Sequence, residues 1–131
     1  MLRKIVRSTL LCMTEASDST SQWLRGVLDL CLMGSLVDEP RYGYEMTSQL
    51  AASGLDAVAE GSIYPALARL ERAGLIEGFS QAGSGGPPRK YYRLTANGRV
   101  VLVRRGQQWR QFARAVDKVL PPATKKGESR G

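Results

Sequence analysis

The chain has 131 residues, of which 43% are apolar, enough for one small domain with a modest core. Its formal net charge of +7 is uneven, because residues 1–84 hold 7 Lys/Arg and 10 Asp/Glu whereas residues 85–131 hold 12 and 2. The chain has no histidine and only two cysteines, which argues against a metal site and a disulfide framework, and it has no apolar run near the ~20 residues that a membrane span needs. The basic half fits either a surface that binds duplex DNA or a solvated surface.

Residues 1–22 precede the first predicted helix as an N-terminal extension. The apolar start is interrupted by Arg7, Ser8 and Thr9, which argues against a signal peptide and for a reduced, cytoplasmic location. The polar run Thr14–Gln22 leaves two interpretations, a short helix packed on the body or a frayed tail, and we favour the tail.

Two helices are predicted next. The first covers Trp23–Val37 and ends at the sequence Asp38-Glu39-Pro40. The second covers Tyr42–Ala52 and ends at Gly54. Apolar or small residues at helical spacing mark the inward side of the first helix: Leu24, Val27, Leu28, Cys31, Leu32 and Ser35.

A third helix is predicted to start at Gly61 or Ser62 and to end near Gly74. Its apolar stripe consists of Ile63, Ala66, Leu67 and Leu70, and its polar edge consists of Ser62, Pro65, Arg69 and Arg72. Small residues beside arginines suit a helix that enters the major groove, because arginine can make a two-point contact with guanine. With that start, Pro65 lies in the first turn or at its edge, where a missing N–H costs little.

Two short strands are predicted to follow, Leu75–Gln81 and Arg89–Thr95, joined by the glycine-rich and proline-rich turn Ala82–Pro88. In the second strand Arg89, Tyr91 and Arg93 alternate with Lys90, Tyr92 and Leu94, so these two sets face opposite ways. Three helices followed by a two-stranded hairpin predict a winged helix-turn-helix, whose third helix enters the major groove.

A last helix is predicted over Ala96–Leu120, with Thr95 as its N-cap. Apolar residues form an imperfect seam along it, which Arg105 interrupts: Leu102, Trp109, Phe112, Val116 and Val119. The seam predicts contact with a second subunit, while the alternative is that the helix folds back on its own domain. Residues 121–131 are a C-terminal tail.

Three segments resemble the PadR family of bacterial transcriptional regulators: RYGYEM at 41–46, EGSIYPALARLERAGLI at 60–76 and GGPPRKYYRLTANG at 85–98. The resemblance covers about residues 23–120. It implies a homodimeric winged-helix repressor of the short form, with a single C-terminal dimerisation helix, which often controls a transporter or stress gene in response to a small molecule. The extension before Trp23 departs from the family's core.

The expected fold is therefore mainly α with a small β-hairpin: an extension (1–22), a winged helix-turn-helix domain (23–95), a dimerisation helix (96–120) and a tail (121–131). The expected function is a DNA-binding transcriptional regulator without cofactor or metal. The alternative is a winged-helix adaptor that binds proteins. An enzyme is disfavoured, because the chain has no histidine, no cysteine-based dyad and no phosphate-binding loop at Gly83, Gly85 and Gly86.

The expected partners are an inverted-repeat operator, a second copy of the chain and an aromatic or cationic effector. Trp109 is the candidate effector contact, although packing explains this tryptophan equally well. We expect Arg69 and Ser62 to contact bases and so determine which DNA sequence is bound. We expect Arg89 and Lys90 to bind phosphates or the minor groove. The full set of expected DNA contacts is Tyr42, Ser62, Tyr64, Pro65, Arg69, Arg72, Arg89, Lys90 and Tyr92.

Overall fold

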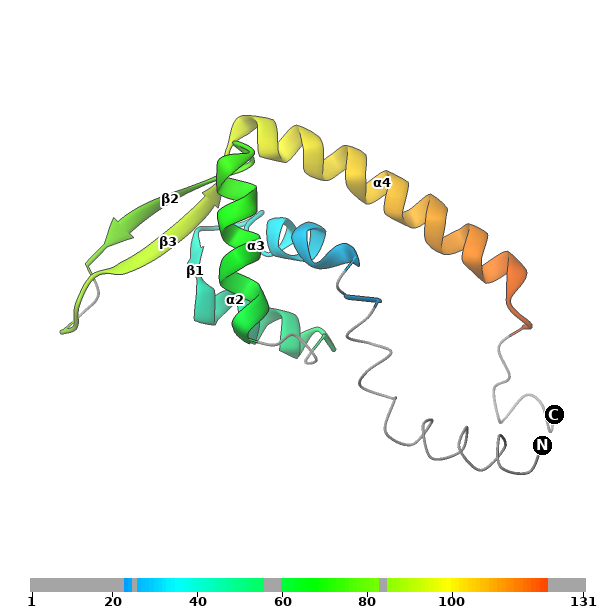
Figure 1. Ribbon diagram of the computed structural model, residues 1–131, viewed down its shortest axis with the longest axis horizontal. Helices are drawn as coiled ribbons and strands as arrows, with labels where there is room; N and C mark the ends of the chain where they lie inside the picture. Colours follow the sequence, from blue (N-terminus) through cyan, green and yellow to red (C-terminus); the bar gives the residue numbers. More distant parts are fainter. Residues whose placement is uncertain (1–22, 25, 56–59, 83–84, 123–131) are drawn as a thin grey trace, which may run out of the picture.

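The structure, a computed structural model, describes residues 23–24, 26–55, 60–82 and 85–122, so the predicted extension, two residues of the wing turn and most of the predicted tail lie outside it. Residues 23–24 and 26–34 form a helix, which we call the first helix. Figure 1 shows the β2–β3 hairpin projecting from one side of the helical body and α4 extending from it in another direction. The further elements are β1 (Arg41–Tyr42), α2 (Gly43–Ala52), α3 (Glu60–Arg72), β2 (Ile76–Gln81), β3 (Arg89–Leu94) and α4 (Ala96–Val119).

The core lies where the first helix, α2 and α3 meet the inner face of the sheet. Four of the six predicted inward positions of the first helix are buried, and Val27 and Cys31 are half-buried. Burial raises the pKa of the Cys31 thiol, which fits the expected role as a small packing residue. The cluster consists of Leu28, Leu32, Met33, Leu36, Met46, Leu50, Ile63, Ala66, Leu67, Leu70, Leu75, Ile76, Tyr92, Leu94 and Val101.

The first helix ends at Gly34, earlier than the predicted end at Val37. The Ser35 hydroxyl donates to the Leu32 carbonyl at 2.7 Å, and the Leu36 N–H donates to the Met33 carbonyl at 3.1 Å. These bonds to the third residue back tighten the last turn. Met33 and Leu36, which the periodicity did not mark, become buried.

Helix α3 starts at Glu60, so the predicted start was one or two residues late and the prediction for Pro65 was wrong. Pro65 is the sixth residue of the helix and lies inside it, where it leaves the Gly61 carbonyl without its usual backbone donor. Both groups lie on the exposed side of the helix, where water can satisfy the carbonyl. The predicted end is confirmed, because Gly74 has a φ of 76° and closes the helix.

The sheet contains a third strand that the sequence did not predict. The strand order is β1-β3-β2, all antiparallel, with Tyr42 opposite Tyr91 and Phe79 also opposite Tyr91. Tyr42 therefore belongs to β1 and precedes α2, instead of starting the helix as predicted. Its N–H donates to the Glu45 carboxylate at 3.1 Å, which anchors the start of α2 to the sheet.

The first turn of α4 is held by a junction that we call the α4 seat: Gly74, Leu75, Thr95 and Gly98. The predicted N-cap is confirmed, because the Gly98 N–H donates to the Thr95 hydroxyl at 2.9 Å. That hydroxyl donates to the Gly74 carbonyl at 2.7 Å, and the Thr95 N–H donates to the Leu75 carbonyl at 3.1 Å. Gly98 is buried against the Leu75 carbonyl, so the start of α4 directly contacts the segment that joins α3 to β2. None of the described helices, α4 included, is both long and apolar enough to cross a membrane.

We predict that Gly98→Ala lowers the free energy of unfolding by about 1–3 kcal/mol. The added Cβ would collide with the Leu75 carbonyl, and a backbone atom cannot move aside as a flexible side chain can. Thermal unfolding at a fixed protein concentration measures the change. The matched control is Gly106→Ala, whose Cβ would meet the Arg110 side chain at 3.4 Å and which should stabilise by roughly 0.5–1 kcal/mol. Two variants of equal stability would show that the seat is not tightly packed.

Candidate nucleic-acid interface

The exposed side of α3 is flat along its middle. With 3.6 residues per turn, Gly61, Pro65, Ala68 and Arg72 lie opposite the buried stripe, and all four are exposed. Three of these side chains are small or absent, so a groove could approach the helix axis closely. Arg72 stands at the end of this row, and it has no ion-pair partner among the described residues.

Arg69 and Ser62 lie on one flank of this row, and both are exposed as predicted. Arg69, however, turns toward the first helix, where its Nη2 donates to Asp29 Oδ1 at 2.8 Å. This pair could not be predicted from local patterns, because the two residues are 40 positions apart.

Tyr64 lies on the opposite flank of α3, and its exposed ring packs over the start of α2. A Cβ at Gly43 would come within 2.7 Å of the Tyr64 hydroxyl oxygen, so glycine is required for this approach. Tyr44, from the same turn of α2, is exposed, while Tyr42 is half-buried. Neither tyrosine belongs to the core cluster.

Glu71 joins α3 to the hairpin and was not predicted as part of the interface. It accepts from Lys90 Nζ at 3.3 Å and from the Gly78 N–H at 3.2 Å. Two elements that are expected to touch DNA together are thus bound to each other through one carboxylate. Lys90, an expected phosphate contact, therefore has a carboxylate partner in its own chain.

The outer face of the sheet carries stacked aromatic rings and arginines. Arg89 donates to the Tyr42 hydroxyl at 3.0 Å, and its guanidinium lies 4.7 Å from the centre of that ring. Arg93 donates to Glu77 at 2.6 Å and lies 4.5 Å from the centre of the Phe79 ring. The predicted alternation of β3 is confirmed, because Tyr92 and Leu94 are buried while Arg89 and Arg93 on the other face are exposed.

Tyr92 cannot act as the DNA contact that the sequence analysis expected. Only 7% of the residue is exposed, and its ring belongs to the core. Burial raises the pKa of its hydroxyl, the nearby Lys90 ammonium opposing this shift. We therefore assign Tyr92 to packing, since a buried ring has no face to offer a nucleic acid.

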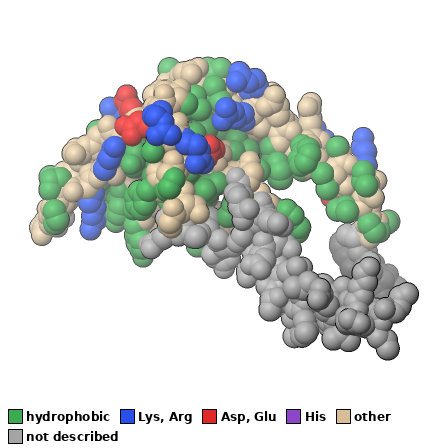
Figure 2. Space-filling model, viewed as in Figure 1, with side chains coloured by type: hydrophobic (Ala, Val, Ile, Leu, Met, Phe, Trp, Pro, Cys, Tyr) green, Lys and Arg blue, Asp and Glu red, His purple; other side chains and the backbone are tan. Residues whose placement is uncertain are grey.

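The basic half of the chain extends beyond the hairpin along α4. Helix α4 contains six basic residues and one acidic residue. In Figure 2, blue Lys and Arg side chains lie over the hairpin and α4 alike. Arg110, Arg114 and Lys118, spaced four residues apart, are exposed on one side of α4.

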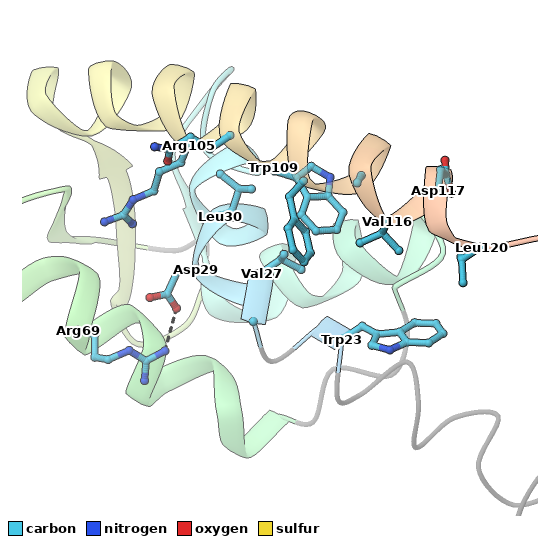
Figure 3. A pocket seen from close by; sticks show the side chains of 14 residues that line it. Trp23, Val27, Asp29, Leu30, Arg69, Arg105, Trp109, Val116, Asp117 and Leu120 are labelled. Carbon is cyan, nitrogen blue, oxygen red and sulfur yellow. Dashed lines mark hydrogen bonds and ion pairs between the residues drawn. The ribbon is translucent and has the colours of Figure 1, made fainter.

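The other side of α4 faces the first helix across a groove of about 1090 Å³. Figure 3 shows Trp109 pointing from α4 toward Val27 and Leu30, and Val116 lying farther along α4 on the side of Trp23, which stands at the start of the first helix. Arg69 and Asp29 line the end of the groove nearest α3. Both tryptophans of the chain thus line one groove, although the sequence analysis assigned only Trp109 to a ligand.

The predicted seam of α4 divides into two parts. Leu102 packs against the core of its own domain, because the seat holds the first turns of α4. Trp109, Phe112, Val116 and Val119 remain 42%, 61%, 39% and 84% exposed. The fold-back alternative thus applies to the first turns of α4 alone, and an apolar surface remains for a partner. Hydrophobic side chains also gather along this part of α4 in Figure 2.

Comparison with known proteins matches residues 32–104 to the transcriptional regulator PadR-like family. The structure is similar to a PadR-like transcriptional regulator from Bacillus cereus strain ATCC 14579, at 40% identity and a TM-score of 0.68, over 78% of this chain and 99% of that one. It is also similar to a PadR family transcriptional regulator from Eggerthella lenta DSM 2243, at 32% identity and a TM-score of 0.68, over 93% and 97% of the two chains. A curated protein of Lysinibacillus sphaericus, called uncharacterized protein X, is 29% identical over 99 residues, which are 74% of this chain and 91% of that protein.

Proposed function

Because this chain belongs to the PadR-like family of transcriptional regulators, we propose that it is a homodimeric repressor that binds an inverted-repeat operator and is released by a small-molecule effector. Members of this family are transcriptional regulators and not enzymes, and DNA binding follows from membership. The observation that carries the proposal is the flat exposed row on α3, which ends at Arg72, the residue after the Glu71 that pairs with Lys90 of the hairpin.

The contacts divide by their chemistry. Ser62, Pro65 and Arg72 lie on the part of α3 that would face the base edges, and Arg69 reaches them if it leaves Asp29. Arg89 and Lys90 lie on the hairpin, where they would contact phosphates or the minor groove after exchanging Tyr42 and Glu71 for DNA. Tyr64 and Tyr42 would donate hydroxyl bonds to phosphates beside α2.

Affinity for operator and for random duplex should respond differently to two substitutions. Lys90→Ala should weaken both complexes and flatten the salt slope by about one unit, because it removes a phosphate contact. Arg72→Ala should cost roughly 1–3 kcal/mol on the operator and less on random duplex, because it removes a base contact. Both effects are measured by titrating the protein into each duplex at several salt concentrations. The operator is a duplex that the protein selects from a random library, and the comparison is a random duplex.

Arg110→Ala is the control for this experiment, since it removes an exposed arginine from α4, away from the proposed interface. It should change the affinity for operator much less than Arg72→Ala does. Equal losses on the two duplexes for Arg72→Ala would remove this residue from base recognition. Failure to select any duplex sequence would contradict the proposed function itself.

The dimer would form through the exposed part of the α4 seam. Four apolar side chains that remain exposed on one side of a long helix favour a second copy as their cover. A two-fold pair would place two copies of α3 about one helical turn of DNA apart, roughly 10 base pairs.

Trp109→Glu combined with Val116→Glu should give a monomer that binds the operator much more weakly, because two charges would enter an apolar interface. Sedimentation at micromolar concentration measures the oligomeric state. The control is Val100→Glu combined with Val103→Glu, which changes two exposed valines on the opposite side of α4 and should leave the dimer intact. A monomeric unmodified protein would overturn this part of the proposal.

The effector would bind in the groove between the first helix and α4. The groove offers two tryptophan rings, flanked by apolar side chains, to a planar apolar or cationic molecule. A ligand there can shift operator affinity only by its preference for one spacing of the two α3 helices, and such coupling is usually ~1–3 kcal/mol.

Ligand stacking on Trp109 should change its fluorescence emission and, in parallel, the affinity for operator. Because Trp23 lines the same groove, the measurement uses a Trp23→Phe background, with Trp109→Phe as the reciprocal control. Titrations with a panel of aromatic cations and phenolic acids, with and without operator duplex, test the prediction. If no compound changes both signals, control by a small molecule is the wrong interpretation.

A further inference from the structure

Arg69 and Arg72 lie one turn apart on α3 but have different surroundings. Arg72 has no ion-pair partner among the described residues, whereas Arg69 Nη2 donates to Asp29 Oδ1 at 2.8 Å. Figure 3 shows the Arg69 side chain extending from α3 to the carboxylate on the first helix. The guanidinium of Arg69 is thus directed toward a carboxylate of the same chain.

The pair is accessible enough to exchange. The side chains of Arg69 and Asp29 are 52% and 34% exposed, so water and ions reach both. Exposed ion pairs of this kind are weak, and their loss changes an equilibrium by roughly two- to five-fold. A guanine edge or a phosphate group that offers Arg69 a better acceptor can therefore displace Asp29.

We propose that Asp29 competes with DNA for Arg69 and thereby lowers the affinity of the protein for its operator. The proposal rests on the proposed function, in which α3 enters the major groove. Binding then requires Arg69 to leave Asp29. The free-energy cost of breaking this pair reduces the net free energy that the DNA contacts of Arg69 contribute to binding. Asp29 is a positioning residue in this scheme, because it acts through Arg69 and touches no DNA itself.

The position of the pair favours competition over simple bracing of the fold. Arg69 lies on the flank of α3 next to the exposed row, so a change of rotamer is enough to bring its guanidinium to that side. The neighbouring side chains Leu70 and Leu67 are buried and hold α3 in place without help from the pair. The stability of the domain should accordingly depend little on Asp29.

The test is a double-mutant cycle on the duplex selected by the unmodified protein, with Asp29→Asn, Arg69→Gln and the combined variant. Asp29→Asn should tighten binding by roughly two- to five-fold, the size of an exposed ion pair. Arg69→Gln should weaken binding. In the Arg69→Gln background, Asp29→Asn should have no more than a small effect, because nothing remains for Asp29 to hold.

Asp38→Asn is the matched control, because this exposed carboxylate lies outside the groove and has no ion-pair partner among the described side chains. It should leave operator affinity unchanged. Thermal unfolding of each variant checks that Asp29→Asn folds as the unmodified protein does. Asp29→Glu, which keeps the charge, should restore the weaker binding.

Two outcomes would overturn the proposal. If Asp29→Asn weakens binding, the pair braces α3 for DNA instead of competing with it. If Asp29→Asn tightens binding equally with and without Arg69, only the negative charge matters. Random duplex serves as an independent substrate, since Arg69 released by Asp29→Asn also reaches phosphates and should tighten that complex. The competition can therefore be measured even if no preferred sequence exists and the proposed function fails.

Discussion

The position of α4 depends on the close contact between Gly98 and the Leu75 carbonyl. A helix can approach a backbone carbonyl this closely only at a glycine, because any Cβ would collide with the carbonyl oxygen. The hydrogen bonds of Thr95 fix the direction of α4 at the same point. The seat joins the end of α3, the start of β2 and the end of β3 to one helix. The groove, the exposed apolar seam and the basic side of α4 all take their places from this junction.

The elements that could be predicted were those whose patterns lie within a few residues. The period of Ile63, Ala66, Leu67 and Leu70 indicated α3, and Thr95 marked the start of α4 correctly. Strand β1 could not be predicted, because two residues carry no periodicity and Arg41–Tyr42 become a strand only by pairing with Tyr92 and Tyr91. The fold was thus accessible from local sequence, and so was part of the exposed row of α3, because Pro65 and Arg72 lie in it while Ser62 and Arg69 lie on its flank. The boundaries near Gly34 and Glu60 were less accessible, because periodicity does not mark the terminal turns of a helix.

The partners of the basic residues were not predictable, since they depend on contacts between distant segments. Arg69 with Asp29, Arg89 with Tyr42 and Lys90 with Glu71 join residues 40, 47 and 19 positions apart. Composition indicated a cationic hairpin, yet two of its three cations are paired with carboxylates of the same chain. Only the folded arrangement distinguishes such cations from those of α4, which face solvent and make the more open positive surface.

The attachment of α4 at one end gives the helix the properties of a lever. Its first turns are fixed in the seat, while Figure 1 shows the remaining turns extending past the body. At 1.5 Å per residue, 24 residues span about 36 Å, so a tilt of one degree at the seat moves the far end by roughly 0.6 Å. The pivot lies next to the end of α3, and the long arm lies along the groove. A small rotation of α4 at the seat therefore produces a larger displacement at its far end. A displacement of the far end produces a smaller one next to the end of α3.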